Sequence, residues 1–180
     1  AARIKVNSLH KETPGFIIAT KNLYDDGLLR DEYYNKVIAN SDEIESIIDY
    51  DKDYTFDYFA LTTLIRAYLL KYDNRTIERP QDLWMRVSLT VSGNEFNLDK
   101  IKETYKSLSS GMYTHATPTL FNSGLKMQQL SSCFLIGMED DSIEGIFNTI
   151  KDCALISKTA GGIGMHAHNI RGSGSRIKST

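Results

Sequence analysis

The sequence predicts an α/β protein in which a mainly helical N-terminal region is followed by the first strands of a parallel α/β domain. Up to about residue 110, apolar residues recur at three- and four-residue steps, which is the spacing of one helix face. Turn-forming residues then cluster between Gly111 and Gly124, and residues 129–170 follow the order strand, helix, strand. This change in pattern predicts a domain boundary near Gly111.

Short helices are expected before residue 58. Between residues 25 and 57, acidic side chains outnumber basic ones, while Val37, Ile44 and Ile48 lie at near-helical intervals. The pattern is typical of surface helices with a solvated acidic face rather than of a binding site.

Three core helices are expected next. The first spans 58–71, with Thr55 or Asp57 available as its N-cap. The second begins at Pro80, because the first helical turn tolerates proline, and the third is capped by Asn97. Their apolar stripes are Leu61, Leu64, Ile65 and Tyr68, then Leu83, Val87 and Val91, then Leu98, Ile101, Tyr105 and Leu108.

The second region predicts two strands around one helix. Residues 129–136 form a β-rich run, with Ser132 and Cys133 on opposite faces, and residues 163–170 can form the second strand. Asp141 or Ser142 caps the helix between them. Its expected inward-facing residues are Ile143, Ile146, Phe147, Ile150 and Ala154.

The composition limits the classes of function. Of 180 residues, 41% are hydrophobic, and the formal net charge of -2 gives no generally basic surface for nucleic acid. No stretch approaches the roughly 18 apolar residues of a membrane span. Two cysteines are too few for a secreted disulfide scaffold, and the first residues lack the apolar core of a signal peptide. We therefore expect a cytoplasmic protein with neither nucleic acid nor membrane as a partner.

Cys133 is the first candidate for chemistry, because it lies beside hydroxyl groups rather than inside an apolar stripe. A reactive cysteine needs a lowered thiol pKa or a nearby redox partner, so a buried structural role is the alternative. Cys153 lies on the expected inner face of its helix, and we interpret it as a core residue.

The basic, glycine-rich end of the chain is the second candidate. Its cations and exposed backbone amides suit a polyphosphate, although a solvated loop is the alternative and no Walker A or Rossmann glycine pattern is present. His166 and His168 lie two residues apart on one strand face, but no third ligand stands at matching spacing, so we predict no metal site. The cations are Lys158, Arg171, Arg176 and Lys178.

Several blocks of this sequence resemble the large subunit of class I ribonucleotide reductase, in its eukaryotic-type branch. They occur in the family order and with family-like spacing, and they cover nearly the whole chain. The blocks are 50–53, 58–59, 68–70, 78–81, 85–88, 114–122, 129–135, 140–146 and 153–164.

The resemblance implies a fold and a domain organisation. Residues 1–15 would be the tail of an ATP-cone regulatory domain, and residues 16–125 the helical N-terminal region. Residues 126–180 would begin a ten-stranded α/β barrel, incomplete in this fragment, and include part of the specificity effector site.

The same resemblance implies a reaction and its residues. Cys133 would be one of the redox cysteine pair that reduces ribonucleoside diphosphates at the 2'-hydroxyl, which supplies DNA precursors, and its partner cysteine lies beyond this chain. Thr117 and Ser132 match positions that bind the nucleoside diphosphate; the family often has Ser in place of Thr117, and Thr keeps the hydroxyl. Neighbouring strand residues point to opposite faces, so Ser132 and Cys133 face one substrate only if the strand is irregular or Ser132 acts through its backbone.

The resemblance also implies allosteric control by ATP and deoxynucleoside triphosphates, bound with Mg²⁺. Asp141, Ser142 and Ile143 match the segment that holds the effector's sugar and base, and Lys158 and Arg171 match residues near its phosphates. Lys178 and Ser179 fall in the effector loop, although their side chains depart from some relatives. The helix that starts at Asp141 helps to form the family's dimer interface.

The implied partners are a small radical-generating subunit, a second large subunit, and thioredoxin or glutaredoxin as reductant, with no cofactor bound directly by these residues. The chain has no initiator Met and ends within a Gly/Ser/basic run, so we expect a piece of a longer protein. It lacks the family's thiyl-radical cysteine, second redox cysteine and catalytic Asn and Glu, so we expect no turnover from it alone. The rival hypotheses are a non-catalytic nucleotide-binding or interaction module and a small metal-binding protein that uses His166 and His168.

Overall fold

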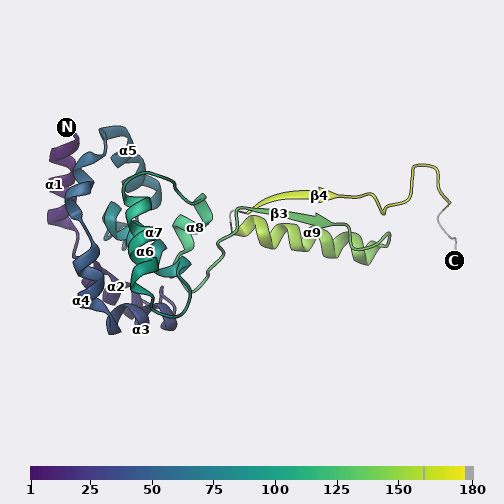
Figure 1. Ribbon diagram of the computed structural model, residues 1–180. Helices are drawn as coiled ribbons and strands as arrows, with labels where there is room; N and C mark the ends of the chain where they lie inside the picture. Colours follow the sequence, from purple (N-terminus) through teal and green to yellow (C-terminus); the bar gives the residue numbers. More distant parts are fainter. Residues whose placement is uncertain (160, 177–180) are drawn as a thin grey trace. The chain divides into compact units, whose positions relative to one another are not determined.

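The computed structural model describes residues 1–159 and 161–176, which form two compact units (Figure 1). The first unit is Ala1–Leu130 and the second is Ser131–Thr180. The prediction of a boundary near Gly111 is therefore wrong, because a further helix after Gly111 packs within the first unit. Residues 126–130 also belong to the first unit.

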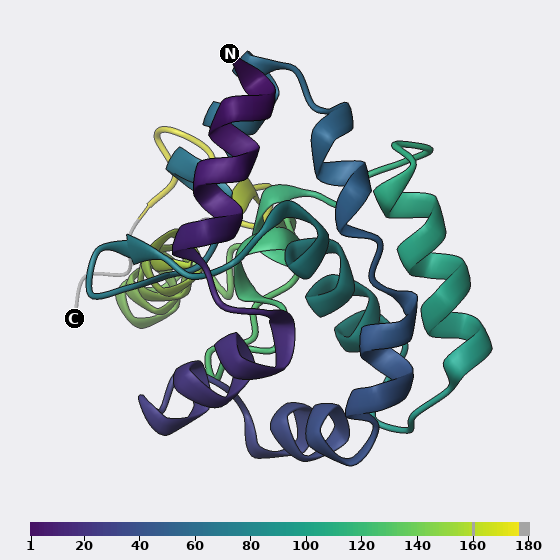
Figure 2. The same ribbon diagram turned by 90° about the vertical axis from the view of Figure 1, so that its left-hand side faces the viewer.

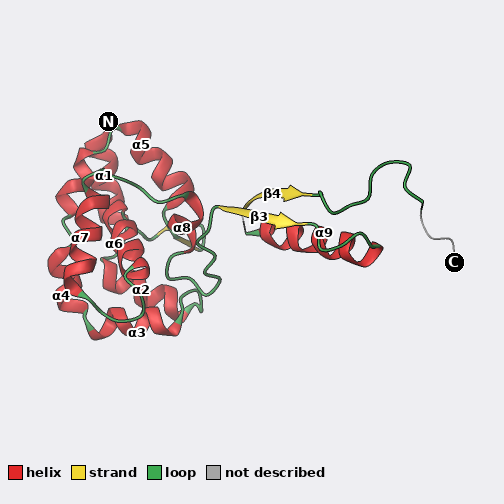
Figure 3. Cartoon of the chain, turned by 45° about the vertical axis from the view of Figure 1, so that its right-hand side comes forward, coloured by secondary structure: helices red, strands yellow, loops and turns green. Residues whose placement is uncertain are grey.

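The first unit is almost entirely helical, as Figure 3 shows. Besides the helices it contains one short antiparallel hairpin, β1 (Lys71–Tyr72) with β2 (Arg75–Thr76). The helical elements are α1 (Ala2–Glu12), α2 (Phe16–Asp25), α3 (Asp31–Ala39), α4 (Ser41–Ile47), the 3₁₀-helix η1 (Tyr50–Thr55), α5 (Tyr58–Thr63), the π-helix η2 (Leu64–Tyr68), α6 (Pro80–Val91), α7 (Leu98–Ser109) and α8 (Thr117–Asn122).

Helix α6 lies in the middle of the first unit, with the other helices around it (Figure 2). Every residue from Pro80 to Leu89 is buried, so this helix has no solvated face in its first three turns. Its start matches the prediction, because proline occupies the first turn and the Asp82 carboxylate accepts a hydrogen bond from the Arg79 backbone N–H at 2.9 Å.

The other predicted caps of this unit are confirmed. Asp57 caps α5 by accepting from the Ala60 N–H at 2.7 Å, and Asn97 caps α7 by accepting from the Lys100 N–H at 3.0 Å. The helix expected over 58–71 is shorter, however, and changes to a π turn at Leu64. The spacing of apolar residues does not distinguish an α turn from a π turn, because in both kinds of turn one side of the segment packs against the core.

The second unit is the predicted strand, helix and strand (Figure 1). Strand β3 (Cys133–Gly137) pairs in parallel with β4 (Gly162–His166), with Cys133 opposite Gly162 and Gly137 opposite His166. Helix α9 (Ile143–Lys158) connects them, and the Ser142 hydroxyl caps it by accepting from the Gly145 N–H at 3.0 Å. Both strands are shorter than expected.

The predicted inner face of α9 is wrong in part. Ile143, Phe147 and Ile150 are 79%, 64% and 50% exposed, and Ala154 is also exposed. Thr149 is instead buried, at 2% exposure. The helix carries apolar residues on more than one side, whereas a two-stranded sheet can cover only one, so periodicity alone did not select the covered side.

Candidate functional site

The thiol of Cys133 lies at the first residue of β3 and is exposed. Gly162 stands opposite it, and a Cβ added there would meet the sulfur at 3.7 Å, so glycine leaves this side of the thiol open. Within the described residues the sulfur is not sealed in a core, which was the alternative raised from the sequence. Its part in catalysis stays a prediction.

Ser132 precedes the strand and lies in a bend, so strict alternation of faces does not apply to it. Its carbonyl accepts a hydrogen bond from the Gly162 N–H at 2.8 Å, which fixes its backbone beside the start of β4. The bend lies before the strand, and the prediction that Ser132 and Cys133 serve one substrate stays a prediction.

Thr117 belongs to the first unit, where it begins α8 rather than the turn that Thr117 and Pro118 predicted. Proline fits the start of this short helix because it needs no N–H partner there. The Thr117 hydroxyl lies 3.4 Å from the Tyr68 hydroxyl, and the Tyr68 ring packs against Phe121 with centroids 5.1 Å apart. Thr117 is only partly buried, and its contact with a substrate stays a prediction.

Two further side chains of α8, Thr119 and Asn122, bond to the segment that follows the helix. Thr119 donates from its hydroxyl to the Leu130 carbonyl at 2.9 Å, and the Asn122 amide donates to the Gln129 carbonyl at 2.7 Å. The two bonds hold the segment that leads directly into Ser132 and Cys133. Helix α8 therefore fixes the last residues of the first unit, Gln129 and Leu130.

Arg86 and Glu78 form a buried ion pair that sequence analysis did not predict, and Arg86 also bonds to the backbone of α8. Arg86 donates to both carboxylate oxygens of Glu78, at 2.6 and 3.1 Å, and these side chains are 2% and 5% exposed. Arg86 also donates to the carbonyls of Ser123 and Leu120, at 2.8 and 3.0 Å. Arg86 lies three residues after Leu83 and directly before Val87, and this position beside the predicted apolar stripe was the one available sequence signal.

Asp82 is a second buried acid that the sequence did not reveal. Burial is the main cause that raises its pKa to about 7, against hydrogen bonds from the Tyr50 hydroxyl at 2.7 Å and the Arg79 N–H, which favour the charged form. Burial, with the Asp82 charge beside it, also raises the pKa of Tyr50. These groups lie in the helical core, and we assign them a structural role.

Four of the predicted effector residues come together in the second unit. Asp141, Ser142, Ile143 and Arg171 line one pocket of about 440 Å³, together with Ile146, Gly172, Gly174 and Ser175. The Arg171 side chain donates from Nε to the Asp141 carboxylate at 2.5 Å and from its terminal nitrogen to the Asp141 carbonyl at 3.0 Å. A carboxylate, a hydroxyl and a guanidinium in one pocket suit a sugar hydroxyl and a phosphate.

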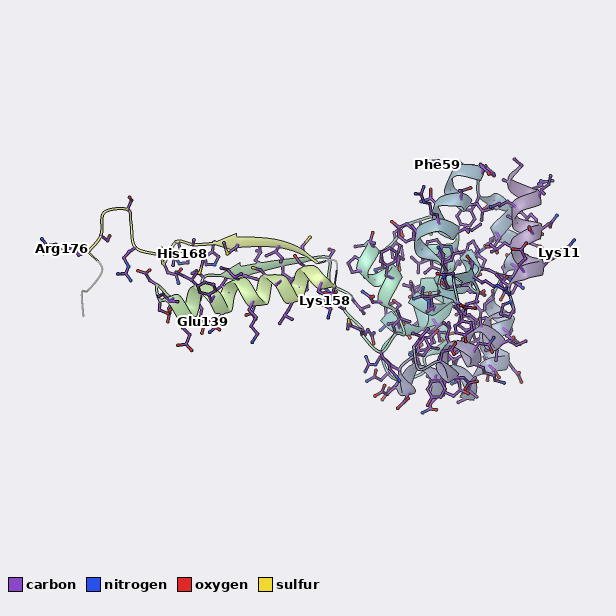
Figure 4. The ribbon with its side chains drawn as sticks, turned by 180° about the vertical axis from the view of Figure 1, so that it is seen from behind. Lys11, Phe59, Glu139, Lys158, His168 and Arg176 are labelled. Carbon is purple, nitrogen blue, oxygen red and sulfur yellow. The ribbon has the colours of Figure 1, made fainter. Side chains whose placement is uncertain are left out.

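The remaining predicted effector residues are not brought to this pocket. Lys158 is the last residue of α9, a helix of 16 residues whose first turn borders the pocket, and such a helix is roughly 24 Å long. Figure 4 shows Lys158 at the opposite end of this unit from Glu139 and His168. Lys178 and Ser179 lie outside the described residues.

His166 and His168 contact each other, with their Nδ1 atoms 2.6 Å apart. The His166 ring also lies over Gly137, where an added Cβ would meet the ring at 2.8 Å. Within residues 1–159 and 161–176, no group of three His, Cys, Asp or Glu side chains is placed to hold a metal ion. Nor is any helix in those ranges both long and apolar enough to cross a membrane.

Comparison with known proteins matches these two units to two parts of one family. Residues 54–128 match the ribonucleotide reductase all-alpha domain, and residues 131–180 match the ribonucleotide reductase barrel domain. The chain is also 46% identical over 190 residues to the ribonucleoside-diphosphate reductase large chain 2 of Saccharomyces cerevisiae. This chain belongs to the ribonucleotide reductase large-subunit family.

Other large subunits of ribonucleotide reductase are similarly close. The large chain of Schizosaccharomyces pombe is 46% identical over 190 residues, and the large subunit of Plasmodium falciparum is 47% identical over 189 residues. Each alignment covers 100% of this chain but only 22% or 23% of the relative. The chain therefore spans less than a quarter of the length of these relatives.

Family membership confirms the predicted fold class, a helical region followed by the first strands of the reductase barrel. The match to the barrel domain begins at residue 131, where the second compact unit also begins. The described residues of this unit contribute β3 and β4, so no barrel closes within them. Helix α1 packs on the core of the first unit through Val6 and Leu9, and its assignment to an ATP-cone domain stays a prediction.

Proposed function

We propose that this chain is part of the large subunit of a ribonucleoside-diphosphate reductase, which converts ribonucleoside diphosphates to 2'-deoxyribonucleoside diphosphates. The observation that carries the proposal is the open thiol of Cys133 at the first residue of β3, in a segment that matches the barrel domain. Replacing the 2'-hydroxyl by hydrogen takes two electrons and two protons, and releases water. Cys133 and a second thiol outside this chain supply them by forming a disulfide.

The substrate contacts in this proposal are Thr117 and Ser132. A hydroxyl at the partly buried start of α8 can donate to a phosphate or ribose oxygen, and threonine at position 117 keeps that ability. Ser132 adjoins Cys133 in the bend before β3, so a substrate held by the one lies within reach of the other.

The pocket at the start of α9 is the proposed specificity site for ATP or a deoxynucleoside triphosphate with Mg²⁺. Asp141 and Ser142 would take the sugar hydroxyl, Ile143 the base, and Arg171 a phosphate. The exposed apolar side chains of α9 fit a homodimer interface. Two such helices packed antiparallel would bring the Lys158 end of each helix to the effector pocket of the other.

The remaining parts of the proposal lie outside the chain. A small subunit supplies the radical, and thioredoxin or glutaredoxin reduces the disulfide. No cofactor is bound directly by these residues, and the protein is cytoplasmic. The isolated chain has no turnover, because the radical cysteine, which this chain lacks, must be held against the substrate.

The test is Cys133→Ser in the full-length large subunit that contains this chain, assayed with its small subunit and a dithiol reductant. Multiple turnover should be lost, because serine cannot form the disulfide. Cys153→Ser is the matched control, since Cys153 is half-buried on α9. Unchanged turnover in Cys133→Ser would reject the reductase role and favour a non-catalytic nucleotide-binding module.

A further inference from the structure

We propose that Tyr68 is a positioning residue for the substrate: its hydroxyl orients the Thr117 hydroxyl toward the nucleoside diphosphate. The inference rests on the proposed function, in which Thr117 contacts the substrate. It adds a residue from a different part of the sequence, 49 positions earlier in the chain.

Tyr68 contacts α8 at two points on one helix face. Its hydroxyl lies 3.4 Å from Thr117 Oγ1, and its ring packs against Phe121. Residues 117 and 121 are one turn apart, so both contacts fall on the same side of the helix. In the described part of the chain, the Thr117 hydroxyl has no other side-chain hydrogen-bond partner.

The orientation of a threonine hydroxyl requires such a partner. The side chain has a few staggered rotamers, and its hydroxyl hydrogen rotates to suit the available acceptors. A bond to Tyr68 favours one arrangement before the substrate arrives. A distance of 3.4 Å is long for this bond, and catalytic hydrogen bonds commonly shorten when the ligand binds.

The backbone that directly follows Tyr68 is held by two hydrogen bonds. Tyr68 ends the π-helix η2, where the Leu69 N–H donates to the Leu64 carbonyl at 2.9 Å, and single π turns are frequent at functional sites. The next N–H, of Leu70, donates to the Glu78 carboxylate at 2.9 Å.

The same ion pair holds both partners in place. Glu78 accepts from the Leu70 N–H and pairs with Arg86. Arg86 in turn donates to the carbonyls of Leu120 and Ser123, at the end of α8. The segments that follow Tyr68 and Thr117 are therefore both bonded to one buried ion pair, through Leu70 and Leu120. This frame explains how two partly exposed side chains keep a defined separation.

The experiment is Tyr68→Phe in the full-length large subunit, with steady-state kinetics against a nucleoside diphosphate. The variant keeps the ring on Phe121 and removes only the hydroxyl. We expect KM to rise about fivefold, the size of one net hydrogen bond, while kcat changes less. Tyr54→Phe is the control, because it removes another tyrosine hydroxyl bond in the same unit, to Asn7 at 2.6 Å, and should leave KM unchanged.

A double-mutant cycle separates this role from simple loss of packing. With Thr117→Val, the partner hydroxyl is absent, so adding Tyr68→Phe should have no further effect on KM. With Thr117→Ser, which keeps the hydroxyl but frees its rotation, the Tyr68→Phe effect should persist or increase. Thermal unfolding of each variant verifies that the chain remains folded.

An equal effect of Tyr68→Phe on KM with Thr117 or with Val at position 117 would overturn the proposal. So would an unchanged KM in Tyr68→Phe when Thr117→Val raises it. If Thr117→Val itself leaves KM unchanged, the positioning role is also rejected. Loss of turnover in Cys133→Ser would then show that the reductase function stands without it.

Discussion

Replacing Arg86 by methionine should be among the most destabilising single changes in the first unit. Arg86 is 2% exposed and its guanidinium makes four hydrogen bonds, two to the Glu78 carboxylate and two to backbone carbonyls. Methionine fills part of the volume but leaves the Glu78 charge buried without its partner. Breaking a buried pair in this way costs about 3–5 kcal/mol.

This cost is large against the roughly 5–15 kcal/mol that usually separates folded from unfolded states. Urea unfolding of the chain, followed by circular dichroism, measures it from the shift in midpoint at constant slope. The double variant Arg86→Met with Glu78→Leu should lose less than Arg86→Met alone, since no buried charge remains. A loss below about 1 kcal/mol in Arg86→Met would refute this reasoning about a desolvated ion pair.

Three further predictions concern other residues. Burial raises the pKa of Asp82 to about 7, above that of the unfolded chain, so the folded state holds a proton that the unfolded state has lost between about pH 4 and 7. In this range the free energy of unfolding should fall as pH rises, by at most about 1.4 kcal/mol per pH unit, and Asp82→Asn should flatten this slope in urea titrations. Ser142→Ala removes the acceptor for the Gly145 N–H and should destabilise the second unit by about 1 kcal/mol in thermal unfolding, whereas no change would argue against the cap. Arg171→Gln in the full-length subunit should weaken binding of a deoxynucleoside triphosphate at least tenfold by calorimetry, and unchanged affinity would remove Arg171 from the effector site.

Local patterns predicted the elements of the fold well. Pro80, Asn97 and Ser142 each begin or cap a helix where the sequence places one, because capping depends on residues within one turn. The order of strand, helix and strand after residue 130 was also predictable from composition and period. The resemblance to a known family supplied what these patterns could not, namely a role for Cys133.

Tertiary features were not predictable from local patterns. The covered side of α9 depends on which surface meets the sheet, so Phe147 is exposed although its spacing placed it inside. The role of Tyr68 beside Thr117 required the fold, because nothing in the sequence joins two positions so far apart.

The most direct test of the account follows the oxidation state of the two cysteines during one turnover. The full-length subunit, freed of external reductant, is mixed with its small subunit and a nucleoside diphosphate, then denatured and alkylated, and the peptides are examined by mass spectrometry. The account predicts that Cys133 becomes disulfide-bonded in proportion to the deoxynucleotide formed, while Cys153 stays open to alkylation. Deoxynucleotide formed with Cys133 still fully alkylated would contradict it.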